Sequence, residues 1–166
     1  MLVTEGNLST KAGVNVPMRA VFAESRSGTL VREREKFWTY DPVNKAFTAL
    51  PVDRIGQEST VVIYKVTTEL GGVVHLPEAA SLLIEKHGME TLVGVRAMCT
   101  FRNWSACKIS RAKVEGTVDP VRYWDTIKSI EVMDRPKTEE EELPVFSIKG
   151  SAGTSRLMVV DSFLVG

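Results

Sequence analysis

The chain of 166 residues is long enough for one well-buried domain and too short for two ordinary ones. Hydrophobic residues make up 43% and charged residues 25%, which excludes a disordered, collagen-like or disulfide-scaffold chain. The 21 basic and 21 acidic residues balance, so the net charge favours neither nucleic acid nor an anionic membrane as a partner. No apolar run approaches the roughly 18–20 residues of a membrane span. The N-terminus is unlike a signal peptide, so we expect a cytoplasmic protein.

Short strands separated by turn residues are predicted along most of the chain. Residues 37–40 and 46–50 are aromatic and β-branched runs on either side of a Pro/Asn turn, which predicts a hairpin. The strongest strand pattern covers residues 60–68, and Gly71-Gly72 after it permits a tight reversal into residues 73–76. Further strands are expected at residues 91–95, 97–101, 123–133, 144–148 and 156–165.

Few segments carry helix signals. Residues 17–24 are expected to form one or two helical turns, because Pro17 suits the first helical position. Residues 77–86 favour a helix when taken alone, since they begin with proline and glutamate and are followed by Gly88. Four consecutive glutamates predict that residues 136–144 form a solvated acidic loop. Together these patterns predict a single, mostly antiparallel β domain.

The sequence carries no common catalytic or metal-binding signature. It lacks the glycine-rich phosphate and dinucleotide loops, the nucleophile elbow of hydrolases and the His-Glu-x-x-His motif. His75 and His87 are too few for a histidine-rich metal centre and are expected at the surface or in turns. Cys99 and Cys107, eight residues apart, match neither a zinc knuckle nor a redox pair. We therefore expect no metal and no cofactor.

Four segments, in their order along the chain, resemble inteins, the Hint-fold elements that excise themselves from a host protein. Residues 63–88 align without gaps on the family pattern V-Y-x-L-x-T-x-x-G, T-x-x-H-x-x-L and G. Residues 123–130, Tyr-Trp-Asp-Thr-Ile-Lys-Ser-Ile, are very similar to a segment of inteins from replicative helicases. Residues 1–18 and 37–41 are the first two of the four segments, and residues 145–148 and 157–166 belong with residues 123–130 to the fourth, C-terminal one. The resemblance implies an all-β, Hint-type horseshoe with pseudo-two-fold symmetry and at most one or two short helices.

The resemblance also implies a self-excision reaction carried out at both ends of the chain. In the family, a Cys or Ser at the first position attacks the preceding carbonyl, and a middle-block Thr and His stabilise that strained bond. The host residue after the intein takes over the acyl chain, and a terminal Asn, often assisted by a His, cyclises and cuts the second junction. The corresponding positions here are Met1 for the nucleophile, Pro77 and Ala80 for the middle-block Thr and His, Ser147 for a polar place often filled by Asp, and Gly166 for the penultimate His.

This sequence departs from the family pattern at those positions. A thioether has no proton to lose, so Met1 cannot form the ester or thioester. Neither Pro77 nor Ala80 can donate a side-chain proton, and the same holds for Ala79 if the register shifts by one residue. Gly166 is the last residue of the sequence, where the family continues with Asn. We therefore expect a splicing domain that is inactive as written and that would act autocatalytically, once, if restored.

The resemblance sets further expectations for organisation and partners. Residues 1–166 would be one mini-intein domain without a homing endonuclease, whose insertion point would be the loop at residues 103–120. The segment at residues 82–84 is a strand in the family, which favours strand over helix for residues 77–86. The partners would be the flanking host segments in cis, with the domain itself a monomer. Two alternatives stay open: a degenerate Hint-fold relic used as a structural or interaction module, and an unrelated β-rich binding protein.

Overall fold

Antiparallel strands make up most of the protein. The computed structural model describes residues 2–3, 6–17, 20, 36–50, 52–59, 62–100, 107–134, 142–148 and 156–166, with the backbone alone at residues 2–3, 52–59, 134 and 142–148. The strands are β1 (Leu2–Val3), β2 (Asn7–Ser9), β3 (Asn15–Pro17), β4 (Phe37–Asp41), β5 (Ala46–Leu50), β6 (Val52–Ser59), β7 (Val62–Thr68), β8 (Val73–Pro77), β9 (Ser81–Lys86), β10 (Met89–Gly94), β11 (Lys108–Lys113), β12 (Val121–Asp134), β13 (Glu142–Ile148), β14 (Leu157–Val160) and β15 (Phe163–Val165). One four-residue helix, α2 (Val95–Met98), lies among them.

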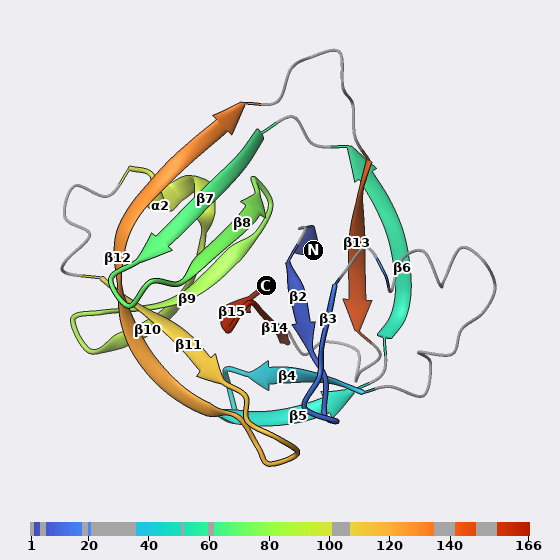
Figure 1. Ribbon diagram of the computed structural model, residues 1–166. Coiled ribbons are helices and arrows are strands. Elements are labelled where there is room, and N and C mark those ends of the chain that lie inside the picture. The colour runs from blue at the N-terminus through green and yellow to red at the C-terminus, as the bar shows by residue number, and fades with distance from the viewer. Residues whose placement is uncertain are drawn as a thin grey trace.

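The strands form two sheets that curl around the ends of the chain (Figure 1). The larger sheet has twelve strands, with the central order β3-β2-β14-β15-β9-β11-β12-β7-β8. The smaller sheet has three strands in the order β1-β13-β6. The long antiparallel pairs β12–β7 and β13–β6 stand on opposite sides of the ring, and β2, β3, β14 and β15 lie between them (Figure 1). The expected all-β horseshoe is therefore confirmed.

The predicted hairpin at residues 37–50 is present as β4 and β5. Asp41 closes its turn, because Oδ1 accepts the N–H groups of Val43 at 2.9 Å and Asn44 at 3.3 Å. The Asn44 side-chain amide donates to the second carboxylate oxygen at 2.8 Å. The hydrogen bond from the Val43 N–H, with those from Asn44, holds the pKa of Asp41 below its ordinary value. The Pro/Asn turn signal thus identified the hairpin correctly.

Residues 77–86 contain a turn followed by the strand β9, not the helix that the local signals favoured. The chain turns at Glu78–Ala79, and β9 begins at Ser81. Leu82 and Ile84 belong to the main hydrophobic cluster, whereas Leu83 belongs to a second cluster with Trp38 and Tyr40. Successive side chains of a strand point to opposite faces, so the three central residues of β9, Leu82 to Ile84, are all apolar because both faces are covered there. The strand implied by the family resemblance is confirmed, and the local helix signals were misleading.

Two expected strands differ from the structure. Residues 95–98, which overlap the strand expected at 97–101, form α2, in which Val95 and Met98 are buried three residues apart on one helical face. The strand expected at residues 156–165 is a hairpin of β14 and β15, reversed at Asp161 and Ser162. Both turn residues have positive φ angles, +48° and +69°. A pair of positive angles belongs to the type I′ turn that suits a two-residue hairpin.

The other loops and the helix expected from the sequence lie only partly within the described residues. β11 lies within residues 103–120, which leaves residues 114–120 as the connection between β11 and β12. β13 begins at Glu142, inside the expected acidic loop, and residues 135–141 lie outside the described residues. Most of the helix expected at residues 17–24 also lies outside them, and Pro17 ends β3.

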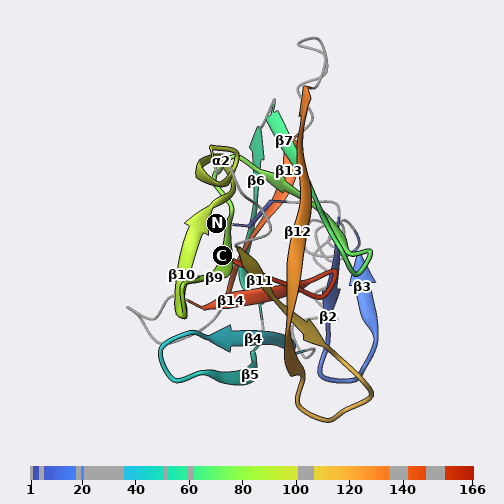
Figure 2. The same ribbon diagram turned by 90° about the vertical axis from the view of Figure 1, so that its left-hand side faces the viewer.

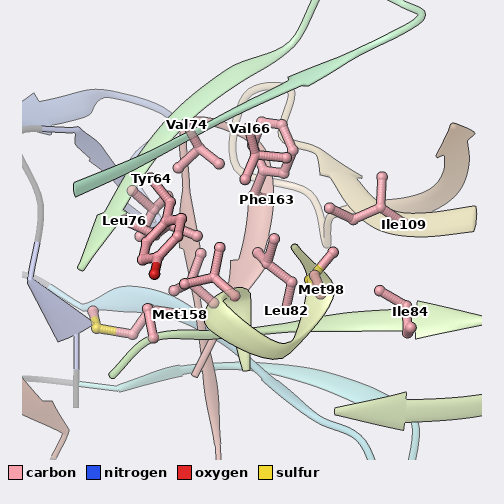
Figure 3. Packing of buried hydrophobic residues seen from close by; sticks show 14 of the residues in the cluster. Tyr64, Val66, Val74, Leu76, Leu82, Ile84, Met98, Ile109, Met158 and Phe163 are labelled. Atoms are coloured by element: carbon pink, nitrogen blue, oxygen red, sulfur yellow. The ribbon is translucent and has the colours of Figure 1, made fainter. Parts of the chain in front are cut away.

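The main hydrophobic core lies on the inner side of the curled sheet (Figure 3). It draws side chains from β7, β8, β9, β11, β14 and β15 and from helix α2. Residues drawn and labelled in this cluster are Tyr64, Val66, Val74, Leu76, Leu82, Ile84, Met98, Ile109, Met158 and Phe163. This packing fixes the C-terminal hairpin against the β7–β8 and β9 strands, which carry the candidate site.

Candidate functional site

The first strand and the last residue of the chain lie beside two consecutive strands, β8 and β9. β1 runs antiparallel to β13, with Leu2 opposite Phe146, and it also lies beside β8. Gly166 exchanges two backbone hydrogen bonds of 2.9 Å with Ser81, the first residue of β9. β8 and β9 follow each other through the turn at residues 78–80, so the two chain ends lie beside consecutive strands. The N and C markers are side by side in both views (Figures 1 and 2).

Pro77 and Ala80 lie in the turn between β8 and β9. Pro77 is buried at the end of β8, opposite Ile63 of β7. The N–H of Ala80 donates to the carbonyl of Pro77 at 3.1 Å, which closes the turn. The carbonyl of Ala80 accepts the N–H of Val95 at 2.9 Å, where α2 begins. These backbone bonds hold the turn against α2, and neither residue contributes a polar side chain.

The other expected site residues belong to the two chain ends. Ser147 follows Phe146, the partner of Leu2, so its backbone lies one residue beyond the pairing of β1 with β13. Gly166 continues β15, whose Val165 pairs with Leu82 of β9. Met1, the expected nucleophile position, lies outside the described residues. The structure thus brings the segments that carry Pro77, Ala80, Ser147 and Gly166 to the place where the chain ends meet.

The two positions that the resemblance led us to expect as counterparts of the family histidines, Ala80 and Gly166, are tightly packed. Ala80 is fully buried within the main hydrophobic cluster, which also contains Val95 and Met98. A Cβ atom added to Gly166 would lie 2.7 Å from Cδ2 of the buried Leu157, closer than such atoms approach without a shift. A histidine at either place would therefore require its neighbours to move.

Replacing Ala80 with histidine is expected to lower the free energy of unfolding by about 1–3 kcal/mol, because it overpacks a filled core. Ala79→His is the matched control, since Ala79 is exposed in the same turn and surface changes stay within about 0.5 kcal/mol. Urea unfolding of both variants measures the difference. Equal stabilities would mean that the core around Ala80 expands freely, in contradiction to this prediction.

A buried ion pair that the sequence analysis did not predict lies beside the C-terminal hairpin. Asp125 of β12 accepts the N–H of Leu70 at 3.2 Å and that of Thr126 at 2.8 Å, and Nη1 of Arg111 donates to it at 3.2 Å. Burial by itself raises the pKa of Asp125. The hydrogen bonds from the Thr68 hydroxyl, the two N–H groups and Arg111 outweigh it and lower the pKa below its ordinary value. Asp125 is therefore an ionised anchor for the β7–β8 turn.

The Arg111 guanidinium is enclosed by aromatic rings and by a glycine. It lies 4.5 Å from the centre of the Phe163 ring and 5.4 Å from that of Tyr123. A Cβ atom on Gly72 would lie 2.5 Å from Cζ of Arg111, so any larger residue there would displace the guanidinium from this position. Gly71, at φ +88°, supplies the turn geometry. The chain reversal predicted at Gly71-Gly72 is confirmed, and the absence of a side chain at Gly72 leaves room for the Arg111 guanidinium.

The histidines and cysteines lie apart from one another. His75 is half-buried on β8, and His87 is exposed in the β9–β10 turn. Cys99 is exposed and Cys107 is buried, and both are free thiols; desolvation raises the pKa of Cys99. Among the described residues, no three His, Cys, Asp or Glu side chains are grouped so that they could hold a metal ion. No helix among the residues that the structure describes is long and apolar enough to cross a bilayer.

The fold is that of solved intein structures. The sequence matches no described protein family and no curated protein. A DnaB intein from Synechocystis sp. PCC 6803 superposes with a TM-score of 0.69 at 14% identity, covering 99% of this chain and 96% of that one. The TvoVMA intein gives a TM-score of 0.72 at 10% identity, with 99% and 95% covered. The transcription factor IIB Mvu mini-intein gives 0.68 at 12% identity, with 99% and 98% covered. The chain therefore has the Hint-type fold of mini-inteins over nearly its whole length.

Proposed function

We propose that this chain is an intein-type protein-splicing domain that acts on the host segments flanking it in cis. The observation that carries the proposal is that β1 lies beside β8 while Gly166 is hydrogen-bonded to Ser81, the first residue of the next strand, β9. Acyl transfer between two junctions requires reacting atoms within about 3–3.5 Å of each other. A fold that returns the end of the chain toward its beginning is compatible with this requirement, and one with distant ends is not.

The proposed chemistry needs side chains at the chain ends and no metal or cofactor. A nucleophile at position 1 would replace the preceding peptide bond by an ester or thioester, and the host residue after the domain would take over the acyl group. An Asn after Gly166 would then cyclise, release the domain and leave the host segments to form a peptide bond. Met1 cannot begin this sequence, so we propose that the chain as written is inactive in splicing.

The test restores the missing groups. A precursor with Met1→Cys, Asn after Gly166, and host segments on both sides with Cys as the first following residue is expected to yield ligated host segments and free domain. Because Pro77 and Ala80 supply no general acid, the first step should be slower by roughly 10²–10⁴-fold than with a proton donor in place. Mass spectrometry and gel analysis over hours to days measure both products.

The matched control carries Met1→Ala in place of Met1→Cys. It should lose the ligated product and retain at most cleavage at the C-terminal junction. A precursor with Cys and Asn restored that shows neither ligation nor cleavage at either junction would contradict the proposed splicing function. Ligation in the alanine control would contradict the role of position 1.

The tight packing at the two expected histidine positions favours a second candidate, a Hint-fold relic that serves as a structural or interaction module. Ala80 and Gly166 would both need rearranged neighbours to regain the family side chain. Such a module would keep the fold and bind a partner without cleaving a peptide bond. Reproducible co-purification of one partner with the chain, together with an inactive restored precursor, would decide for this candidate.

In the proposed splicing role the domain is a monomer in the cytoplasm. The connection at residues 114–120 is where a larger intein would accommodate an endonuclease, because it is an exposed turn between β11 and β12 whose extension leaves both strands paired.

A further inference from the structure

Asp161, at the turn between β14 and β15, is bonded to the N-terminal segment through its side chain and its backbone. Oδ1 of Asp161 accepts the N–H of Asn7 at 3.1 Å and the side-chain amide of Asn7 at 3.4 Å. The N–H of Asp161 donates to the carbonyl of Asn7 at 3.0 Å. Residues 154 positions apart in the sequence are thus joined directly.

Close packing at Gly6 sets the distance between these segments. A Cβ atom on Gly6 would overlap Oδ2 of Asp161 and lie 2.8 Å from Cγ1 of Val160. A larger residue at position 6 would require the Asp161 carboxylate and the Val160 side chain to shift. The approach of the two segments is therefore a specific contact rather than a loose crossing.

Arg111 holds the same turn from the opposite side. Its Nη2 donates to the carbonyl of Asp161 at 3.4 Å, while Nη1 is paired with Asp125. The neighbouring Ala112 N–H donates to the carbonyl of Ser162 at 2.9 Å. Both residues of the turn are thereby tied to β11, and through Asp125 to β12 and the β7–β8 turn.

We propose that Asp161 is a positioning residue which, held by Arg111, sets the register between the N-terminal segment and the C-terminal hairpin. This inference rests on the proposed splicing function and names the residue that aligns the two junctions. From Asp161 the chain runs through β15 to Gly166, and from Asn7 it runs back through Gly6 toward β1. A shift of one segment against the other would separate the junctions, because each end lies only a few residues from this contact.

The composition of the network supports a role in alignment over a role in stability. Nε of Arg111 is buried and has no hydrogen-bond partner in the described part of the chain. A buried ion pair with an unpaired donor contributes little net stability compared with apolar packing of similar volume. The network of Asp125, Arg111 and Asp161 instead fixes how the β7–β8 turn, the C-terminal hairpin and the N-terminal segment are placed relative to one another.

The experiment compares Asp161→Gly and Asp161→Asn in the chain as it exists. Glycine removes the carboxylate yet adopts the positive φ without strain, whereas asparagine keeps an Oδ1 acceptor and also tolerates that angle. Residue-resolved amide hydrogen exchange is expected to be about tenfold faster at Asn7 and Gly166 in Asp161→Gly, because both hydrogen bonds from Asn7 to the carboxylate are lost and the two segments are no longer held together through it. Asp161→Asn should remain within about twofold of the parent chain at both amides.

Asp119→Gly, in the exposed β11–β12 turn, controls for effects that any Asp-to-Gly substitution in a turn would have. It should leave both amides unchanged. Unchanged exchange at Asn7 and Gly166 in Asp161→Gly would overturn the proposal. So would a uniform increase across β7 and β12, because that would show general destabilisation instead of a loosened contact between the chain ends.

A second readout uses the restored splicing precursor. Asp161→Gly is expected to lower the ratio of ligated product to single-junction cleavage by about tenfold, and Asp161→Asn to preserve the ratio. Equal ratios in the parent and Asp161→Gly precursors would overturn the positioning role. If the parent precursor forms no product at all, the splicing function fails, and the exchange measurement alone supports or overturns the register proposed for Asp161.

Discussion

Replacing Asp125 by alanine is expected to lower the free energy of unfolding by about 3–5 kcal/mol. The side chains of Arg111 and Asp125 are only 10% and 1% exposed, so the substitution leaves a cation in the interior without its carboxylate. It also removes the acceptor for the N–H groups of Leu70 and Thr126. Urea unfolding followed by tryptophan fluorescence and circular dichroism measures the loss.

Asp125→Asn is the matched control, since it removes the charge and keeps an acceptor oxygen. The pH dependence then tests the charge itself. Because folding lowers the pKa of Asp125 below its ordinary value of 3.8, the stabilisation is present above pH 3.8 and is lost as the pH falls through the lower folded pKa. The parent chain should therefore lose more stability on acidification than Asp125→Asn. Parallel pH profiles would contradict the assignment of an ionised Asp125.

Replacing Phe163 by alanine should cost about 3–5 kcal/mol of unfolding free energy. Phe163 is 0% exposed at the start of β15, and its side chain points into the main core (Figure 3). Its ring also covers the Arg111 guanidinium at 4.5 Å. Truncation would leave a cavity and uncover the cation, so chemical denaturation should show a large decrease in midpoint.

Two further variants separate these contributions. Phe163→Leu keeps most of the apolar volume without the ring face and should lose less than half as much stability. Phe47→Ala removes a ring of β5 that is only half-buried, 4.9 Å from the ring of Tyr40, and should also cost less. A loss at Phe47 equal to that at Phe163 would show that β15 is not an anchor of the core.

Local sequence patterns located most of the strands. The Pro/Asn turn at residues 41–45 and the Gly71-Gly72 pair each marked a reversal between two strand-forming runs, and both hairpins are present. The pattern failed at residues 97–101, because α2 is a single turn whose side chains at Val95 and Met98 are buried by tertiary packing. A helix of a single turn is too short to show a helical period in the sequence, so a strand-like composition hides it.

Residues 77–86 show where local propensity and tertiary context compete. Proline at the start and Gly88 after the end are ordinary helix boundaries, yet β9 is a strand. Its consecutive apolar residues Leu82 and Leu83 face different hydrophobic clusters, and a covered strand needs no alternation. The resemblance to inteins corrected the local signals because it carries information about the whole fold.

The candidate site was only partly accessible from the sequence. The resemblance to inteins implied that Pro77, Ala80 and Gly166 belong together, and the structure places their segments at one end of β8 and β9. The Arg111–Asp125 pair is separated by 14 residues and the Asn7–Asp161 contact by 154, and neither follows a motif. Asp125 does lie in the Tyr-Trp-Asp-Thr-Ile segment that resembles inteins, which was the available signal for it.

The sequence by itself determined the all-β character of this protein, most of its hairpins and the chemical identity of the groups at its expected reaction positions. These properties follow from residue types and neighbours a few positions apart. Tertiary structure alone decided that Ala80 and Gly166 are tightly packed. It also placed the Arg111 side chain against Gly72 and the Asp161 side chain against Gly6, and it bonded the N-terminal segment to the last hairpin. Such features depend on atoms brought together by folding, and long-range contacts leave no periodic trace in a single chain.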